Sequence, residues 1–203
     1  MTVRIDRIQT TGASGHHDES DPALPCNSWI VGDDEECVII DPGADPDTVL
    51  DLVGRRETLA IICTHAHHDH TSAVPELSLR TNATVYLHPD ALDQWREVHP
   101  RIDPEGELAD GQQFQVGDAT LEVLETPGHA PGTVCLWAPE LRAVFTGDTL
   151  LASGPYASPE GGSDYSTMEY SVRKRLFPLG DDAVIKPGRG KDCTIANQRA
   201  EQS

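Results

Sequence analysis

The sequence feature that most constrains the fold is a cluster of metal-binding side chains at the end of a buried strand. Residues 59–63 form a continuous apolar run, which is typical of a strand buried on both faces, and the stretch after it, 64–70, reads T-H-A-H-H-D-H. A turn this rich in imidazole and carboxylate carries a high desolvation cost beside a buried strand unless a cation compensates it. We therefore expect a metal site where this strand ends.

The ligand types and their spacing indicate an open, catalytic site. Imidazole and carboxylate, with no cysteine inside the cluster 64–70, suit zinc, iron, manganese or nickel and argue against a closed structural zinc site. In an extended or turn conformation His65 and His67 point to the same side, whereas Asp69 and His70 lie beyond a bend and can address a second position. His68 has the opposite parity and is not expected to bind. The predicted cofactor is one or two ions, zinc first, with iron or manganese as alternatives.

Two later segments carry one candidate ligand each. His129 lies in T-P-G-H-A-P-G, a turn stiffened by proline and glycine, and Asp148 follows the apolar stretch 143–146 in F-T-G-D-T. Alone, His129 would more often be a turn residue, and Asp148 could be the N-cap of a helix. In the company of the histidine cluster, both are candidates for the same site.

Strand and helix patterns alternate along the chain. Strands are predicted at 3–8, 28–31, 37–40, 59–63, 84–87, 112–116, 120–124, 134–138, 143–146 and 183–186. Helices are predicted at 45–54, 72–80, 90–98, 168–177 and 194–200. Segments 10–25 and 152–166 lack apolar periodicity and are predicted to be long loops. This order favours an α+β fold with two sheets flanked by helices, in a single domain over residues 1–203.

With T-H-A-H-H-D-H, T-P-G-H-A-P-G and F-T-G-D-T-L in this order, the chain resembles the metallo-beta-lactamase superfamily from residue 30 to about 196. The likeness is greatest to glyoxalase II-type hydrolases, here in a short form that lacks their C-terminal helical domain. The resemblance implies an αββα sandwich of two mixed sheets, with the site at one edge. It also implies a first metal bound by His65, His67 and His129 and a second bound by Asp69, His70 and a bridging Asp148.

An earlier aspartate also matches the family pattern. Asp41 lies in I-D-P-G at 40–43, and the resemblance implies that it orients the histidine loop without binding metal itself. A plain turn aspartate is the alternative that the sequence leaves open.

One residue departs from the family pattern. The second metal site usually ends on a histidine in P-G-H-G, whereas this chain has Arg189 in K-P-G-R-G. Arginine cannot ligate, because its guanidinium has no free lone pair. Three outcomes are open: weak binding of a second metal, a single-metal site, or an Arg189 that points away while water fills the gap. Alternatively, Arg189 binds a carboxylate or phosphate of the substrate.

Substrate contacts are expected from the two long loops and the surface near Arg189. Tyr156 and Tyr165 are candidates for lining the pocket. Whether His16 or His17 reaches the site is left open.

The resemblance implies hydrolysis of an activated acyl bond by metal-activated water, with Asp69 orienting the nucleophile and carrying its proton. Thioesters are the leading substrate class, ahead of lactones and beta-lactams, and glutathione thioesters are disfavoured by the missing helical domain. One alternative is a mononuclear iron protein that dioxygenates persulfides through His65, His129 and Asp148. Another is a degenerate metal-binding module in which Arg189 marks lost activity.

Charge and cysteine content limit the partners. The formal net charge is −19, which repels nucleic acid and anionic membranes. We therefore expect a small-molecule or carrier-bound acyl substrate and neither nucleic acid nor membrane as a partner; a homodimer is left open. The chain has five cysteines, an odd number, and they lie in apolar runs, which predicts reduced thiols. Together with the absence of an apolar leader, this predicts a cytoplasmic protein. The excess of arginine over lysine hints at a bacterial source.

Overall fold

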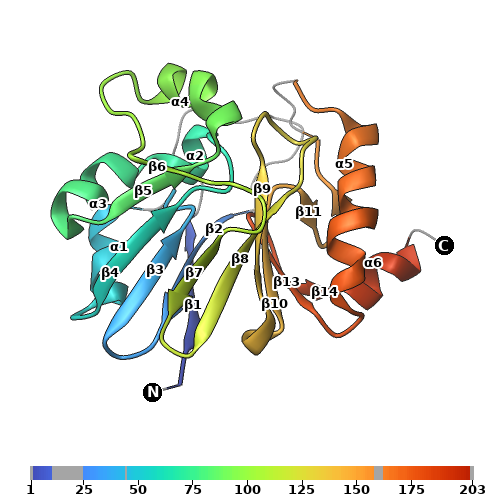
Figure 1. Cartoon of the computed structure of the whole chain (residues 1–203), viewed down its shortest axis with the longest axis horizontal. Coiled ribbons are helices and arrows are strands. Elements are labelled where there is room, and N and C mark those ends of the chain that lie inside the picture. The colour runs from blue at the N-terminus through green and yellow to red at the C-terminus, as the bar shows by residue number, and fades with distance from the viewer. Residues whose placement is uncertain (1, 11–24, 44, 158–161, 202–203) are drawn as a thin grey trace.

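The computed structural model describes residues 2–10, 25–43, 45–157 and 162–201 (Figure 1). Two six-stranded sheets face each other, and helices cover the outer face of each. The predicted α+β class and αββα sandwich are confirmed. His16 and His17 lie outside the described residues.

The first sheet has the strand order β1-β2-β3-β4-β5-β6. Its strands are β1 (Arg4–Thr10), β2 (Cys26–Gly32), β3 (Glu36–Ile40), β4 (Glu57–Ile62), β5 (Thr84–Leu87) and β6 (Gly106–Glu107). β1, β2 and β3 pair antiparallel, and β3 to β6 pair parallel, so the sheet is mixed.

The second sheet has the order β14-β13-β10-β9-β8-β7. Its strands are β7 (Gln113–Val116), β8 (Ala119–Glu125), β9 (Val134–Ala138), β10 (Ala143–Gly147), β13 (Val184–Pro187) and β14 (Cys193–Thr194). Only β10 and β13 pair parallel among these. A separate two-stranded sheet joins β11 (Leu150–Leu151) and β12 (Gly154–Pro155).

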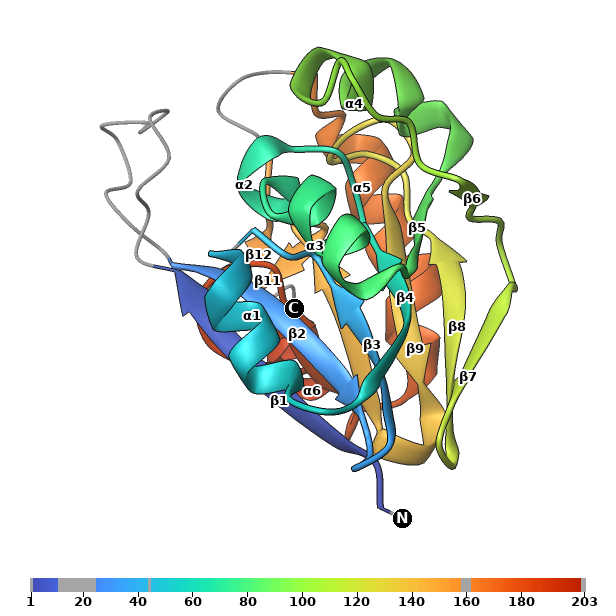
Figure 2. The same cartoon turned by 90° about the vertical axis from the view of Figure 1, so that its left-hand side faces the viewer.

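The helices lie on the two outer faces. Figure 2 shows α1 and α3 in front of the first sheet, and Figure 1 shows α5 and α6 beside the second. The helices are α1 (Pro46–Val53), α2 (His68–Thr71), α3 (Val74–Thr81), α4 (Leu92–Val98), α5 (Tyr165–Ser171) and α6 (Ile195–Glu201). In the described part of the chain, no helix is long and apolar enough to cross a bilayer.

The alternation of side chains along the strands builds three apolar layers. In β3, Cys37 and Ile39 pack toward the helices of the first sheet, whereas Val38 and Ile40 pack between the sheets. In β10, Phe145 faces the space between the sheets and Val144 faces the helices of the second sheet. Both faces of the central strands are thus buried, which explains their nearly continuous apolar sequence.

The structure differs from the predicted elements where local signals are weak or short. Segment 152–166, predicted to be a loop, contains β12 and the first residues of α5. α5 begins three residues before the predicted 168, because Asp164 caps it: its Oδ1 accepts hydrogen bonds from the backbone N–H groups of Ser166 and Thr167. The predicted helix 168–177 is divided, since a π-helical turn over Val172–Leu176 continues α5. Two-residue strands such as β6 and β14 are too short to show a period.

Candidate metal centre

The candidate ligands gather at one edge of the sandwich because several strands end there. β3 and β4 run parallel in the first sheet, and β10 and β13 run parallel in the second. β8 has the same direction as β10, because both pair antiparallel with β9. The carboxyl ends of β3, β4, β8, β10 and β13 lead into Asp41, His65, His129, Asp148 and Arg189, respectively. Residues far apart in the sequence are thereby brought together.

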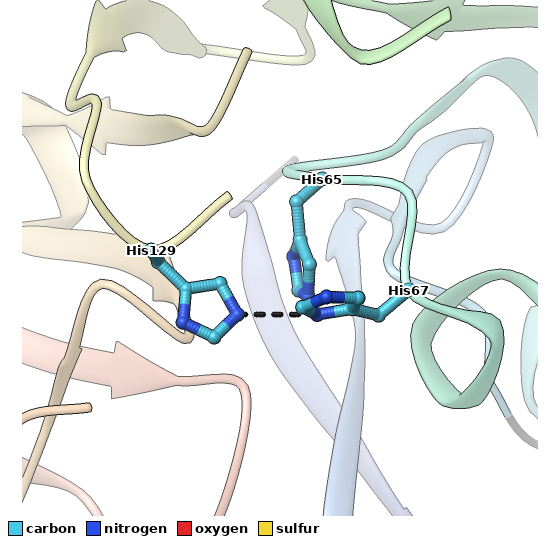
Figure 3. A group of neighbouring side chains, drawn as sticks. All are labelled: His65, His67 and His129. Atoms are coloured by element: carbon cyan, nitrogen blue, oxygen red, sulfur yellow. Dashed lines mark hydrogen bonds between the residues drawn. The ribbon is translucent and has the colours of Figure 1, made fainter. Parts of the chain in front are cut away.

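Three histidines face one another at the edge where the two sheets meet. Figure 3 shows His65 and His67 on the loop after β4 and His129 on the opposite loop. One ring nitrogen from each lies within 4.8 Å of the others, and Nε2 of His129 is 3.1 Å from Nδ1 of His67. The three residues predicted to bind the first metal therefore lie together.

Hydrogen bonds determine which ring nitrogen of His65 can bind a metal ion. Thr64 Oγ1 donates to Asp41 Oδ2 at 2.6 Å, so this hydroxyl accepts from Nδ1 of His65, which is 3.0 Å away. Nε2 of His65 is buried and has no hydrogen-bond partner among the described residues. The lone pair of Nε2 is therefore directed at the place where an ion would lie.

Asp41 is linked to His65 through Thr64, as an orienting role would require. Its Oδ1 also accepts from the Thr64 backbone N–H at 2.7 Å. Its backbone has φ 50°, a left-handed conformation that few residues other than glycine adopt. The chain thus turns sharply after β3 and places the carboxylate beneath the histidine loop.

The tautomer of His129 is fixed in the same way. Its Nδ1 lies 2.7 Å from the carbonyl oxygen of Tyr156, which can only accept, so Nδ1 carries the proton. The Tyr156 ring also lies over His129, with centroids 6.0 Å apart and planes at 25°. Nε2 of His129 is left to face His67.

Burial keeps the three imidazoles neutral. It lowers the pKa of His65 well below its ordinary value, and the neighbouring histidines lower it further. Burial, and then the nearby imidazole of His129, lower the pKa of His67 to about 4. Burial also lowers the pKa of His129. All three therefore carry free lone pairs at neutral pH, as metal binding requires.

Asp148 lies between the three histidines and His70. Its Oδ2 is 3.9 Å from Nε2 of His129 and 3.4 Å from Nε2 of His70. Burial favours its protonated form, but the charges of His70 and Arg189 outweigh burial and hold its pKa well below the ordinary range. A buried Oδ1 of this ionised carboxylate has no hydrogen-bond partner in the described structure. Unpartnered buried groups of this kind need an explanation, and a bound cation supplies one.

His70 is held among carboxylates. Burial alone would lower its pKa, but the charges of Asp148 and Asp69 raise it to about 9. Its Nδ1 is 3.8 Å from Asp41 Oδ2, and its ring lies 4.6 Å from that of His65. The site therefore offers three neutral imidazoles and one buried carboxylate, with a fourth imidazole beside that carboxylate. This set of donors fits a divalent transition metal.

Arg189 points into this site and not away from it. Its Nε donates to Asp148 Oδ2 at 2.8 Å and its Nη2 to Asp69 Oδ2 at 2.5 Å. The guanidinium carbon also lies 5.7 Å from the centre of the Tyr156 ring. The structure therefore contradicts one of the three expected outcomes, in which Arg189 points away and water fills the gap. Its binding of a substrate anion stays a prediction, although the side chain is already engaged by two carboxylates.

Cys26 is a site residue that the sequence did not single out. Its thiol donates to Asp69 Oδ2 at 3.4 Å and accepts from Nη1 of Arg189 at 3.2 Å. Cys26 begins β2, which is antiparallel to β3, so the amino end of this strand lies at the edge where its neighbours end. Only the strand pairing reveals this position, because the sequence around Cys26 carries no ligand motif.

Two other residues lie apart from the three histidines. His68, which was not expected to bind, begins α2 and is exposed. Tyr165 begins α5 and is 54% exposed. Its predicted role in a substrate pocket stays a prediction, whereas Tyr156 lies directly against His129.

Close packing of the loops depends on glycine. A Cβ at Gly188 would lie 2.6 Å from Oδ1 of Asp148 and 2.8 Å from Cε1 of His70. At Gly147, where φ is 47°, a Cβ would lie 2.3 Å from Oγ1 of Thr64. These positions let the loop after β13 and the loop after β10 approach the ligands.

Comparison with known proteins agrees with this arrangement. Residues 21–189 match the family described as the metallo-beta-lactamase superfamily. The hydroxyacylglutathione hydrolase GloC of Haemophilus influenzae is 29% identical over 196 residues, which cover 87% of this chain and 91% of GloC. The atrochrysone carboxyl ACP thioesterase of Aspergillus chevalieri is 33% identical over 164 residues, which cover 76% of this chain and 48% of that enzyme.

Two solved structures are also similar. The di-iron-bound form of TTHA1623 is 31% identical with a TM-score of 0.75, covering 87% of this chain and 93% of its own. ETHE1 from Myxococcus xanthus is 25% identical with a TM-score of 0.76, covering 98% of this chain and 82% of its own.

Proposed function

Because the chain belongs to the metallo-beta-lactamase superfamily, we propose that it is a metal-dependent hydrolase that cleaves thioesters. The observation that carries this proposal is the convergence of three neutral imidazoles on one point. Nε2 of His65 is aimed at this point and has no hydrogen-bond partner in the part of the chain that the structure describes. His65, His67, His129 and Asp148 would hold the ion. A divalent ion bound there would lower the pKa of water toward neutrality and polarise a carbonyl oxygen.

Asp69 is the residue best suited to move a proton. Burial raises its pKa, but the charges of His70 and Arg189 outweigh burial, so its pKa is lowered and the carboxylate is ionised at neutral pH. Its side chain is 30% exposed, whereas that of Asp148 is fully buried. Asp69 can therefore reach a water molecule and a leaving group from the open side of the site, where it accepts the proton of the nucleophile and passes it on.

The thioester class is supported by two relatives. One is named a hydrolase of hydroxyacylglutathione and the other an ACP thioesterase. Both substrates present an activated acyl–sulfur bond, one on a small thiol and one on a carrier protein. Lactones and beta-lactams are less favoured substrates of the same machinery.

Oxidation of persulfides by a single iron is the second candidate. His65, His129 and Asp148, which this reaction would use as ligands, lie together, and the chain is similar to ETHE1. Zinc- and iron-loaded samples would be compared for thiol release from thioesters and for oxygen uptake with a persulfide. Oxygen uptake by the iron form without thioester turnover by either form would replace hydrolysis with oxidation.

A pair of histidine variants tests the proposed hydrolase. His129→Ala removes an imidazole that faces the ion, and we expect kcat/KM on acyl thioesters to fall by at least about 100-fold. His68→Ala removes an exposed histidine nearby and should leave turnover unchanged. The measurement is thiol release from a panel of small-molecule, CoA and ACP thioesters. A His129→Ala variant as active as the parent chain would contradict the proposal.

A further inference from the structure

We propose that the guanidinium of Arg189 takes the place of a second metal ion, so that this chain holds one ion only. The inference rests on the metal binding assumed in the proposed function and deepens it. The single ion would lie at His65, His67 and His129 with Asp148. Asp69 and Cys26 would then face the guanidinium of Arg189 and not a metal ion.

The contacts of Arg189 are those that a second ion would need. Cys26, Asp69 and His70 each present one ligand atom, and these three atoms lie within 4.8 Å of one another. Two of these residues hydrogen-bond Arg189: Asp69 through Nη2 at 2.5 Å and Cys26 through Nη1 at 3.2 Å. Asp148, the carboxylate between the two positions, accepts from Nε at 2.8 Å. An ion could enter here only by displacing the guanidinium from all three partners.

The backbone around Arg189 is fixed by β2. Arg189 forms a β-bridge with Cys26, and the Asn27 side chain donates to the carbonyls of Pro187 and Gly190, each at 2.9 Å. The Asn27 backbone N–H donates to the carbonyl of Gly188 at 2.7 Å. Only 18% of the Arg189 side chain is exposed. The backbone that carries Arg189 is therefore fixed against β2, and the guanidinium is held in the site and not in solvent.

The charge of Arg189 favours the same stoichiometry. Its guanidinium is always protonated, and it lies against the carboxylates of Asp69 and Asp148. A second divalent ion would add two positive charges in a buried region, next to a guanidinium, where repulsion is weakly screened.

Metal content tests this inference without any substrate. Purified protein equilibrated with excess Zn²⁺ and then desalted should retain about one ion per chain, whereas Arg189→His, which restores an imidazole, should retain about two. Arg189→Lys keeps the cation and should stay near one. The metal is counted by mass spectrometry of the digested protein, and circular dichroism verifies that each variant is folded.

Each outcome bears on the proposal. Two ions in the parent chain, or one ion in a folded Arg189→His variant, would overturn it. If Arg189→His does not fold, anomalous diffraction at the zinc edge on the parent chain decides. One peak beside the three histidines supports the proposal, and a second peak between Asp69 and Asp148 contradicts it. A protein that holds one ion but cleaves no thioester would contradict the proposed function and would still support this inference.

Discussion

At the scale of single residues, the site depends on small polar groups that direct the histidines. Thr64 is completely buried and links Asp41 to Nδ1 of His65. Partners of this kind fix the tautomer and the orientation of a metal-binding histidine. The sequence identified Asp41 through its motif, but Thr64 is recognisable only once the strand ends have been placed side by side.

Replacing Thr64 by valine tests this link. Thr64→Val keeps the shape of the side chain and removes the hydroxyl between Asp41 and His65, so we expect metal affinity to fall about 10- to 100-fold. The measurement is a competition titration of Zn²⁺ against a chromophoric chelator. Thr58→Val, at the opposite end of β4, removes a buried hydroxyl that does not touch the histidines. Equal affinities for Thr64→Val and the parent chain would contradict the role given to the hydroxyl.

At the scale of elements, the start of α5 holds the His129 loop. The backbone N–H of Asp164 donates to the carbonyl of Gly128 at 2.7 Å, and Ser163 Oγ donates to the carbonyl of His129 at 2.6 Å. The Asp164 side chain caps the helix with hydrogen bonds from Ser166 and Thr167. The capping interaction therefore stabilises both α5 and the loop that presents a ligand.

Removing the cap should destabilise the chain in a pH-dependent way. The hydrogen bonds from Thr167 and Ser166 lower the pKa of Asp164 from 3.8 to about 2. Since the folded-state pKa lies below the unfolded value, the stabilisation is fully present above about pH 4 and is lost as the pH falls through 2. We expect Asp164→Ala to lower Tm by about 2–4 °C at pH 6.

Thermal unfolding followed by circular dichroism at pH 6 and near pH 3 measures the effect. The difference in Tm between Asp164→Ala and the parent chain should shrink at the lower pH. Asp51→Ala removes an exposed carboxylate from the middle of α1 and controls for the change in net charge. A difference that is independent of pH would show that the carboxylate does not act as a cap.

Hydrophobic periodicity predicted most elements close to their observed bounds, because both faces of the central strands are buried. The strand over 84–87 and the hairpin of β7 and β8 are examples. The elements that were missed have other causes: β11 and β12 are too short for a period, and α5 begins at a capping signal inside a polar segment. In the site, the position of Cys26 and the direction of the Arg189 side chain depend on the pairing between β2 and the loop after β13. No local sequence pattern predicts this pairing.

At the scale of the whole molecule, both sheets contribute to the site. His65 and His67 follow β4 of the first sheet, and His129 and Asp148 follow β8 and β10 of the second. The edge where they meet also carries buried carboxylates that need a positive charge. Metal binding should therefore stabilise the entire fold and not one loop alone.

Removal of the metal tests this coupling. Dialysis against EDTA should lower Tm, and Zn²⁺ should restore it, with a stabilisation of about 2.7 kcal/mol when free Zn²⁺ is 100 times the Kd. Differential scanning calorimetry measures the change. His65→Ala, which lacks a ligand, should show little response to either treatment. A parent chain whose Tm is insensitive to chelation would refute the coupling.

The division of the ligands between the sheets has a consequence for how the protein matures. Neither sheet on its own assembles the three histidines, and His67 and His129 are separated by 62 positions in the chain. The proposed ion would therefore meet its full set of histidines only after the two sheets have packed against each other. Bound metal would then report that the sandwich has closed.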